Sequence, residues 1–210
     1  MSRKQLCLAI LLSLIAMSTF SRAQDEQNQV AALIGRTFVS DQGLQCGGCP
    51  NPFIHTGKGL TLEGNFSRYL LYRQLFAVSG EVPVVWAFQQ KLNAGENVVP
   101  ESYKDLFITP AARVNLFPGT AISPWVSIGG GYGHISQSSS LVFGGSNPGK
   151  SSNMGVLEGG FGLDVRVWRK YSVRGQVRDF WGNTPNYPLA TTDKTRQHNY
   201  FVGVGVIYHF

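Results

Sequence analysis

The sequence predicts an all-β protein, an eight-stranded antiparallel transmembrane β-barrel whose strands follow one another in an up-and-down meander. Three observations predict this fold class. Apolar residues recur at every second position along eight segments, which is the period of a strand with one apolar face. The connections between these segments are alternately long and short. Charged residues make up only 14% of the 210 residues, although 43% are hydrophobic.

The composition excludes two other classes of protein. An aromatic content of 12% together with few charges is unlike an intrinsically disordered chain. A mean hydropathy of −0.05 is too low for a bundle of transmembrane helices.

Residues 1–23 have the pattern of a cleaved signal peptide, which leaves 24–210 as the barrel domain. A basic start is followed by an apolar stretch over 6–17 and a small-x-small cleavage site over 21–23. The segment holds three of the 18 basic residues and no acid, so the mature chain has 15 basic against 12 acidic residues and a net charge of +3 instead of +6. Such a small charge without a basic cluster argues against nucleic-acid binding.

The eight predicted strands are each long enough to cross a bilayer. In chain order they are 29–40, 59–71, 75–88, 104–117, 121–135, 153–168, 171–181 and 198–210. About ten residues at a rise of ~3.3 Å, tilted near 45°, cover roughly 24 Å, the height of the apolar band of a transmembrane barrel. Backbone groups in lipid must all be hydrogen-bonded, so such strands have to close into a barrel.

One face of the strands is apolar and predicts contact with lipid. In chain order this face includes Leu60, Leu62, Phe66, Val78, Val82, Val84, Trp86, Leu157, Phe161, Leu163, Val173, Val177, Val202, Val204 and Val206.

The opposite face carries isolated charges and predicts a closed polar interior. Its members are Arg36, Glu63, Glu81, Arg113, Glu158, Asp164, Arg166, Arg174 and Arg178. These are five arginines and four acids with no lysine, whereas ordinary solvated faces would carry lysine as often. Paired guanidinium and carboxylate groups satisfy several donors at once and suit an interior with little water.

The connections fit a membrane barrel with distinct ends. The long ones are 41–59, 89–103, 136–152 and 182–197, and the short ones are about 72–74, 118–120 and 169–170. Bacterial outer membrane barrels have short periplasmic turns and long extracellular loops. Aromatic residues near strand ends are expected to form interfacial girdles; they are Tyr69, Tyr72, Phe88, Tyr103, Phe117, Trp168, Tyr171, Trp181 and Tyr208.

With these features the mature chain resembles the small eight-stranded outer membrane β-barrel proteins of the OmpA/OmpX kind, over nearly all of 29–210. The C-terminal pattern resembles the signal by which the outer membrane assembly machinery recognises its clients; it consists of Val202, Val204, Val206, Tyr208 and Phe210. The resemblance implies a Gram-negative outer membrane location, periplasmic chaperones and insertion by that machinery, but no activity.

Two cysteines lie three residues apart in the first long connection. In an exported protein Cys46 and Cys49 are expected to form a local disulfide, of small stabilising effect because the ring is short. Metal binding is an alternative in which His55 supplies a third ligand. The sequence otherwise indicates no metal and no cofactor.

One pattern hints at an enzyme. His134 and Ser136 resemble the His-x-Ser of outer membrane lipid A deacylases, and His134 has the parity of the lipid face. Hydrolysis would need a carboxylate to orient the histidine, but the nearest acid, Glu158, points inward by parity. An interfacial histidine beside a serine-rich loop is the favoured interpretation.

The sequence therefore predicts a non-catalytic protein with a structural or surface-interaction role through its extracellular loops. Its expected partners are outer membrane lipids and lipopolysaccharide, with no nucleic acid and an unidentified loop ligand. A narrow channel is the first alternative, although an eight-stranded barrel is just filled by its own side chains. Lipid A deacylation is the second.

Overall fold

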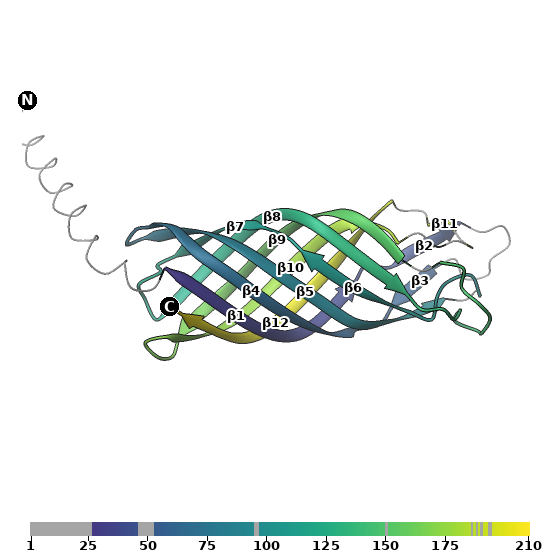
Figure 1. Cartoon of the computed structure of the whole chain (residues 1–210), viewed down its shortest axis with the longest axis horizontal. Helices are drawn as coiled ribbons and strands as arrows, with labels where there is room; N and C mark the ends of the chain where they lie inside the picture. The colour runs from purple at the N-terminus through teal and green to yellow at the C-terminus, as the bar shows by residue number, and fades with distance from the viewer. Residues whose placement is uncertain are drawn as a thin grey trace, which may run out of the picture.

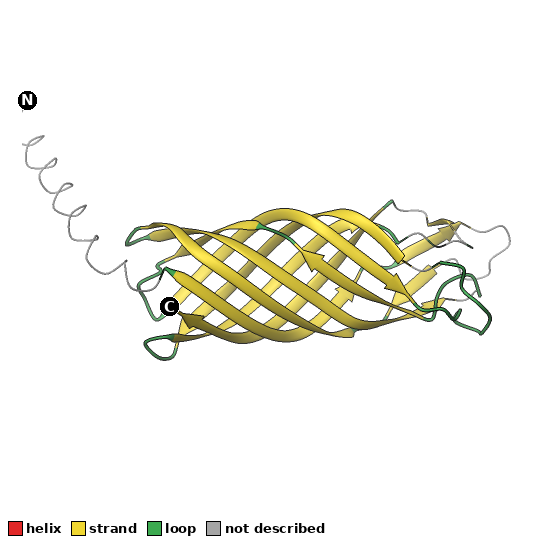
Figure 2. Cartoon of the chain, in the orientation of Figure 1, coloured by secondary structure: helices red, strands yellow, loops and turns green. Residues whose placement is uncertain are grey.

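The computed structural model describes residues 27–45, 53–94, 97–149, 151–185, 187, 189, 191–192 and 195–210. The predicted signal peptide and both Cys46 and Cys49 lie outside them. The described residues form strands joined by turns and loops (Figure 2). In this part of the chain no helix is long and apolar enough to cross a membrane.

Eight stretches of strand form the wall of a barrel (Figure 1). In chain order these are β1 (Asn28–Val39), β4 (Gly59–Tyr72), β5 (Phe76–Ala94), β6 (Ser102–Ile108) continued by β7 (Ala111–Leu116), β8 (Ile122–Gln137), β9 (Ser151–Arg166), β10 (Tyr171–Asn183) and β12 (Arg196–His209). Each pairs antiparallel with the strands before and after it, as the predicted meander requires.

The first and last strands close the ring. β1 and β12 are paired from Gln29 opposite His209 to Val39 opposite Asn199. Beyond this ladder the Asn28 N–H donates to the Phe210 carbonyl and the Phe210 N–H to the Asn28 carbonyl, both at 2.9 Å. The described barrel wall therefore has no free edge, which is what a lipid environment requires.

The fourth wall strand is interrupted, whereas a single strand over 104–117 was predicted. Thr109 and Pro110 separate β6 from β7. Proline has no N–H to donate to a ladder, but its carbonyl accepts from Gly130 at 3.1 Å, and the Thr109 N–H reaches the Pro83 carbonyl at 3.3 Å. Both neighbouring strands, β8 and β5, are thus still hydrogen-bonded to the wall strand at the break.

The two ends of the barrel differ. The terminal end, which holds Asn28 and Phe210, also carries the three short turns after β4, β7 and β9 (Figure 1). Phe117 in the second of these turns has φ 51°, a left-handed conformation that is uncommon for a large side chain. The opposite end, here the loop end, carries the long connections and three added strands, β2 (Gln42–Gln45), β3 (Phe53–Thr56) and β11 (Thr191–Thr192).

The loop end is more ordered than the sequence predicted. β5 continues to Ala94, well past the expected end at 88, and pairs with β3 there. β3 pairs with β2 and β2 with β11, so a small sheet extends the barrel wall beyond its rim (Figure 1).

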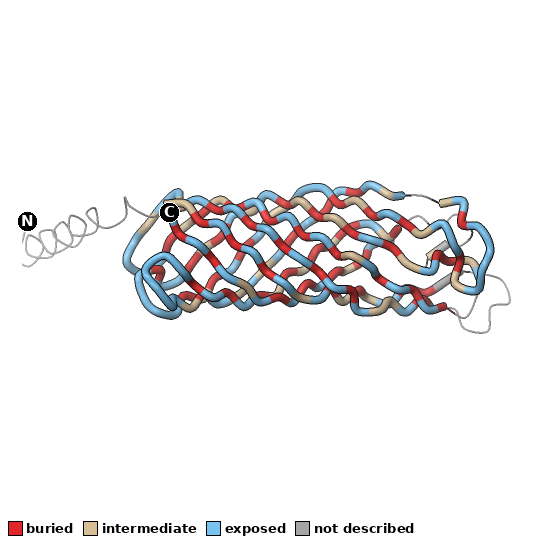
Figure 3. The backbone as a smooth tube through the Cα atoms, turned by 60° about the horizontal axis from the view of Figure 1, so that its bottom comes forward, coloured by how far each residue is buried: buried red, intermediate tan, exposed pale blue. Residues whose placement is uncertain are grey.

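Burial alternates along the wall strands, as the two-residue period predicts (Figure 3). The outward positions are apolar and exposed around the whole ring; examples from successive strands are Ile34, Leu62, Val84, Val126, Phe161, Val173 and Val204. Soluble proteins rarely expose so large an apolar surface to water. The exposed apolar ring matches the lipid-facing belt of a transmembrane barrel.

The interior is divided into two layers, and polar side chains are buried in both. A polar layer, which holds most of the charged side chains, lies toward the terminal end. On its loop side lies a cluster of apolar residues, here the apolar layer, in which Phe107 and Phe180 stack with centroids 4.8 Å apart; uncharged polar side chains such as Thr61, Gln90 and Gln197 are buried around it. This apolar layer includes Tyr103, Ile135, Val156 and Phe201, all buried.

Candidate functional site

The polar layer brings together seven of the nine charged residues that were predicted to line the interior. They are Glu63, Glu81, Arg113, Glu158, Asp164, Arg174 and Arg178, each at most 8% exposed. The seven come from β4, β5, β7, β9 and β10, so the network ties together strands on different sides of the ring. No lysine is among the buried residues of the described chain.

Arg178 lies at the centre of a group of three carboxylates. Its Nη1 lies 2.7 Å from Glu158 Oε1 and 2.9 Å from Glu81 Oε1, and its Nε lies 3.4 Å from Glu63 Oε1. Gln176 donates a short hydrogen bond to the second oxygen of Glu63. One guanidinium thus faces three buried carboxylates, a geometry that lysine could not reproduce.

Two further arginines complete the network. Arg174 makes a bidentate pair with Asp164, at 2.7 and 2.8 Å. Arg113 lies 3.2 Å from Glu81 and donates to Gln29 on β1 at 2.7 Å. A buried charge is tolerated only when it is paired. These contacts therefore explain how seven charged side chains can be buried inside a membrane barrel.

Trp125 of β8 lies between the arginines and was not predicted as part of the site. The guanidinium carbons of Arg174, Arg178 and Arg113 lie 5.0, 5.1 and 5.6 Å from its ring. Its Nε1 donates to Asp164 at 3.1 Å. A sequence signal was present, because Trp125 shares its strand face with Ser123 and Ser127 and therefore belongs to the polar side.

Two predicted network members lie elsewhere. Arg36 is exposed on the outer face, with the same parity as Ile34, so its assignment to the interior was wrong. It stands near the loop end of β1, where a long side chain can extend its charge toward the membrane interface. Arg166 has inward parity but lies exposed at the terminal mouth of the barrel.

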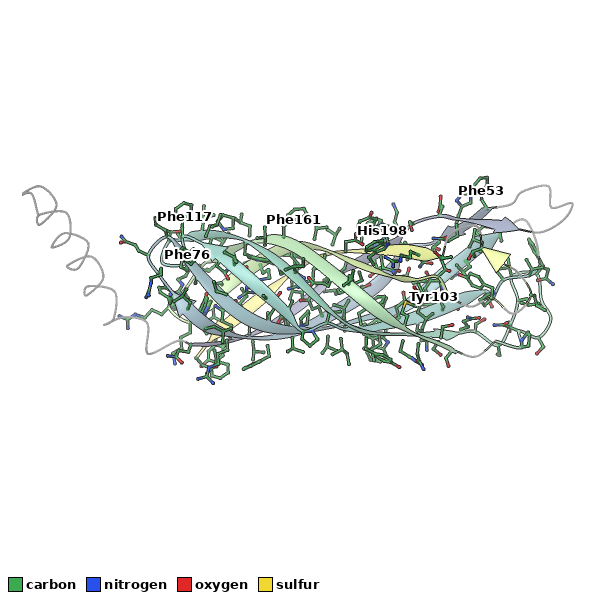
Figure 4. All side chains as sticks on the ribbon, turned by 90° about the horizontal axis from the view of Figure 1, so that it is seen from above. Phe53, Phe76, Tyr103, Phe117, Phe161 and His198 are labelled. Carbon is green, nitrogen blue, oxygen red and sulfur yellow. The ribbon has the colours of Figure 1, made fainter. Side chains whose placement is uncertain are left out.

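The predicted aromatic girdles also need correction at two positions. Tyr69 faces inward and accepts a hydrogen bond from Gln29 at 2.6 Å. Tyr103 is only 1% exposed and lies in the apolar layer. At the terminal end the predicted Phe117 does lie on the outside, and so does Phe76, which was not predicted as a girdle residue (Figure 4).

The apolar layer contains one buried carboxylate. Asp105 is fully buried, and neither of its oxygens has a hydrogen-bond partner among the described residues. Tyr187 of the last loop is buried near it, and burial raises the pKa of the Tyr187 phenol above its ordinary value. In the described part of the chain, the loop side of the interior therefore holds one carboxyl group without a hydrogen-bond partner among mostly apolar side chains.

The outer face bears the pair with the His-x-Ser pattern. His134 has outward parity, and Glu158 faces inward, as predicted. Asn153 Oδ1 lies 2.6 Å from His134 Nδ1 and accepts from the Tyr132 hydroxyl at 2.7 Å. The histidine is thus oriented by an amide and not by a carboxylate, and Ser136 follows it as an exposed residue on the same face.

Within the described residues no cluster of three histidine, cysteine, aspartate or glutamate side chains could hold a metal ion. His55 contacts Asp41 at 2.9 Å. The residues of the predicted assembly signal, Val202, Val204, Val206, Tyr208 and Phe210, all face outward and are exposed.

Comparison with known proteins identifies the class. No family model and no curated protein matches the sequence. Among solved structures, Neisserial surface protein A (NspA) matches with a TM-score of 0.52 and 12% identity over 87% of this chain and 97% of NspA. OprG, an outer membrane protein from Pseudomonas aeruginosa, matches with a TM-score of 0.52 and 11% identity over 88% of this chain and 97% of OprG.

The chain therefore has the fold of the small eight-stranded outer membrane β-barrel proteins. The outer membrane enzyme PagL is also similar, with a TM-score of 0.40 and 12% identity over 85% of this chain and 97% of PagL. That likeness is too weak to bear on activity, since this fold carries many functions.

Proposed function

We propose that the protein is an integral outer membrane β-barrel that acts through its extracellular loops as a surface-interaction protein, without catalysis. The observation that carries the proposal is the closure of the barrel interior. The polar layer is filled by Trp125 and three buried arginines, and the apolar layer by stacked aromatic rings. With the interior filled, the loop end is the surface left for contact with other molecules.

Two of the described loop segments at the loop end are joined by hydrogen bonds. The Asn97 side chain accepts from the Phe143 N–H at 2.9 Å and donates to the Gly144 carbonyl at 2.8 Å. This clamp joins two loops that are distant in sequence. Phe143, at 64% exposed, projects from one of these loops, and Phe53, at 49% exposed, projects from β3. Figure 4 shows Phe53 at the loop end of the molecule. Exposed aromatic residues on rigid loops are typical anchors of interfaces.

The proposal can be tested with whole cells. Cells that express the protein should adhere to at least one member of a panel of immobilised glycoproteins and glycans more than cells with the empty vector. The double change Phe53→Ser and Phe143→Ser should abolish the difference at equal surface level. The matched control is Phe161→Leu on the lipid-facing belt. If cells that express the protein adhered to every member of the panel no more than cells with the empty vector, the proposal would be wrong and a purely structural role would remain.

Biogenesis follows from the same proposal. We expect periplasmic chaperones and the assembly machinery to handle the chain, with the outward residues that end at Phe210 as its recognition signal. Deletion of Phe210 should lower the amount of protein in the outer membrane, measured by immunoblot of membrane fractions. Refolding of the purified chain into detergent should be affected less, because one pair of hydrogen bonds to Asn28 is lost from a long ladder.

A second candidate function is hydrolysis of an ester of lipid A. An amide oxygen only accepts, so the contact with Asn153 assigns the hydrogen to His134 Nδ1 and leaves Nε2 as a base. Nε2 would take the proton of Ser136 as its Oγ attacks the ester carbonyl, and water would then release the acyl group. A neutral amide stabilises the resulting imidazolium less than a carboxylate does, which is why this function ranks second.

Mass spectrometry of lipid A distinguishes the two functions. Loss of an acyl chain in cells that express the protein, abolished by Ser136→Ala and retained in Ser151→Ala, would establish the enzyme. Unchanged lipid A in all three strains is the result expected from a non-catalytic protein.

A further inference from the structure

A groove of about 340 Å³ crosses the outer surface of the barrel near its loop end. It runs over β8, β9 and β10 and reaches Arg196 at the start of β12. Gly130, Gly131 and Gly155 form its floor, and Leu157 and Trp181 form its walls. The groove lies on the outward face. One of its lining residues, Trp181, stacks on His198, which is labelled in Figure 4.

The floor contains a glycine that the fold does not require. At Gly131 an added Cβ would overlap with the Ile108 carbonyl oxygen, so no other residue fits there. At Gly155 an added Cβ would have no atom within 4 Å. A larger outward residue at 155 is therefore compatible with the barrel, and its absence leaves the hollow open.

The two ends of the groove differ in polarity. Toward the middle of the barrel it is bordered by the apolar Leu157, which is 56% exposed. Toward the loop end it is bordered by Asn183 and Arg196, which are paired opposite each other. The groove is thus apolar toward the middle of the barrel and cationic toward the loop end. A phosphorylated lipid has the same arrangement, with its acyl chains toward the middle of the membrane and its phosphate at the surface.

The cationic end is held in place by stacked rings. The Arg196 guanidinium lies 4.4 Å from the Trp181 ring, and Trp181, His198 and Tyr200 stack in a row with centroids 5.8 and 5.6 Å apart. The nearby carboxylate of Asp179 contacts His198 Nδ1 at 2.7 Å. A guanidinium that stacks on a ring still presents its N–H donors at its edge, where they suit a phosphate.

We propose that this groove is a binding site for one molecule of lipid A from the surrounding leaflet, with an acyl chain over Gly155 and a phosphate on Arg196. The site is independent of the loops, so it stands whether or not they bind a partner. It requires no catalysis.

Native mass spectrometry of the folded protein in detergent, titrated with purified bisphosphorylated lipid A, tests the site. One lipid A should bind at concentrations where phosphatidylethanolamine does not. Gly155→Leu fills the groove and should weaken binding about tenfold, and Arg196→Gln should weaken it by about the same factor because a charge-assisted contact is lost. With dephosphorylated lipid A, Arg196→Gln should bind like the wild type.

The barrel supplies matched controls. Gly64 on β4 is also outward with no atom within 4 Å of an added Cβ, and it lies four wall strands away from Gly155. Lys104 on β6 is an outward cation four wall strands away from Arg196. Gly64→Leu and Lys104→Gln should bind lipid A like the wild type.

Folding of every variant is checked by its heat-modifiable migration on a gel. Equal binding by Gly155→Leu and Gly64→Leu, or equal binding of phosphatidylethanolamine and lipid A by the wild type, would overturn the proposal. Should Gly155→Leu fail to fold, the comparison of Arg196→Gln with Lys104→Gln still decides it.

Discussion

Trp125 shows how a single residue makes a charged interior possible. Three guanidinium groups lie 5.0–5.6 Å from one indole ring, where the ring faces attract cations that would otherwise repel one another. The indole N–H meanwhile binds Asp164. The side chain therefore acts as a separator between like charges and as a hydrogen-bond donor.

Replacing Trp125 should test both roles. We expect Trp125→Phe to lower the free energy of unfolding by about 2 kcal/mol, because the bond to Asp164 is lost and a phenyl ring attracts cations less strongly. Urea unfolding in lipid vesicles measures it. Trp86 is the control, since it faces outward, and Trp86→Phe should cost less than about 1 kcal/mol. Equal losses in the two variants would contradict the role assigned to Trp125.

Two buried acids should respond in opposite directions to the same change. Asp105 has no hydrogen-bond partner among the described residues, so Asp105→Asn removes the cost of burying a carboxyl group and should stabilise the barrel by about 1–3 kcal/mol at pH 7. Glu81 contacts Arg113 and Arg178, so Glu81→Gln should destabilise it by about 3 kcal/mol. Unfolding in urea measures both. A Glu81→Gln barrel as stable as the wild type would show that the network does not stabilise the fold, and a destabilised Asp105→Asn barrel would contradict the cost assigned to the Asp105 carboxyl group.

At the scale of elements, the alternation of residue types predicted the eight wall strands and most of their bounds. It did not predict the break between β6 and β7, which depends on contacts of Thr109 and Pro110 with two neighbouring strands. Nor did it predict the small sheet at the loop end, whose short strands pair with one another and are joined to the wall where β3 pairs with β5.

The candidate site was predictable only in part. Parity decides which side of the wall a residue faces, and the prediction for Arg36 was wrong because Arg36 shares the parity of the outward Ile34. Parity cannot tell which inward residues meet, because that depends on the stagger between strands. The separation into a polar and an apolar layer, and the meeting of three arginines at Trp125, follow from this stagger.

The break in the wall makes β8 unusually sensitive to substitution. We expect Gly131→Ala to prevent folding, because the added methyl group would overlap with the Ile108 carbonyl oxygen and push β8 away from β6. Gly155→Ala on β9 has open space and should fold normally. The measurement is the unheated, faster-migrating band on a gel. A normal band from Gly131→Ala would mean that the two strands can separate without loss of the barrel.

At the scale of the whole molecule, the filled interior predicts the absence of a pore. Purified protein in planar bilayers should give no stable single-channel steps, whereas a sixteen-stranded porin in the same apparatus should give them. Arg113 and Arg178 are fully buried and both contact Glu81, so we expect the polar layer to block a continuous water path. Reproducible steps of one size would support the narrow-channel alternative.

The division of the wall into an outer and an inner face also determines which substitutions each position tolerates. Outward positions need only be apolar, so mutations there can accumulate freely among valine, leucine, isoleucine and phenylalanine. Inward positions such as Arg178 and its three carboxylates can change only together. Barrels of this fold can therefore share a backbone at only 11–12% sequence identity.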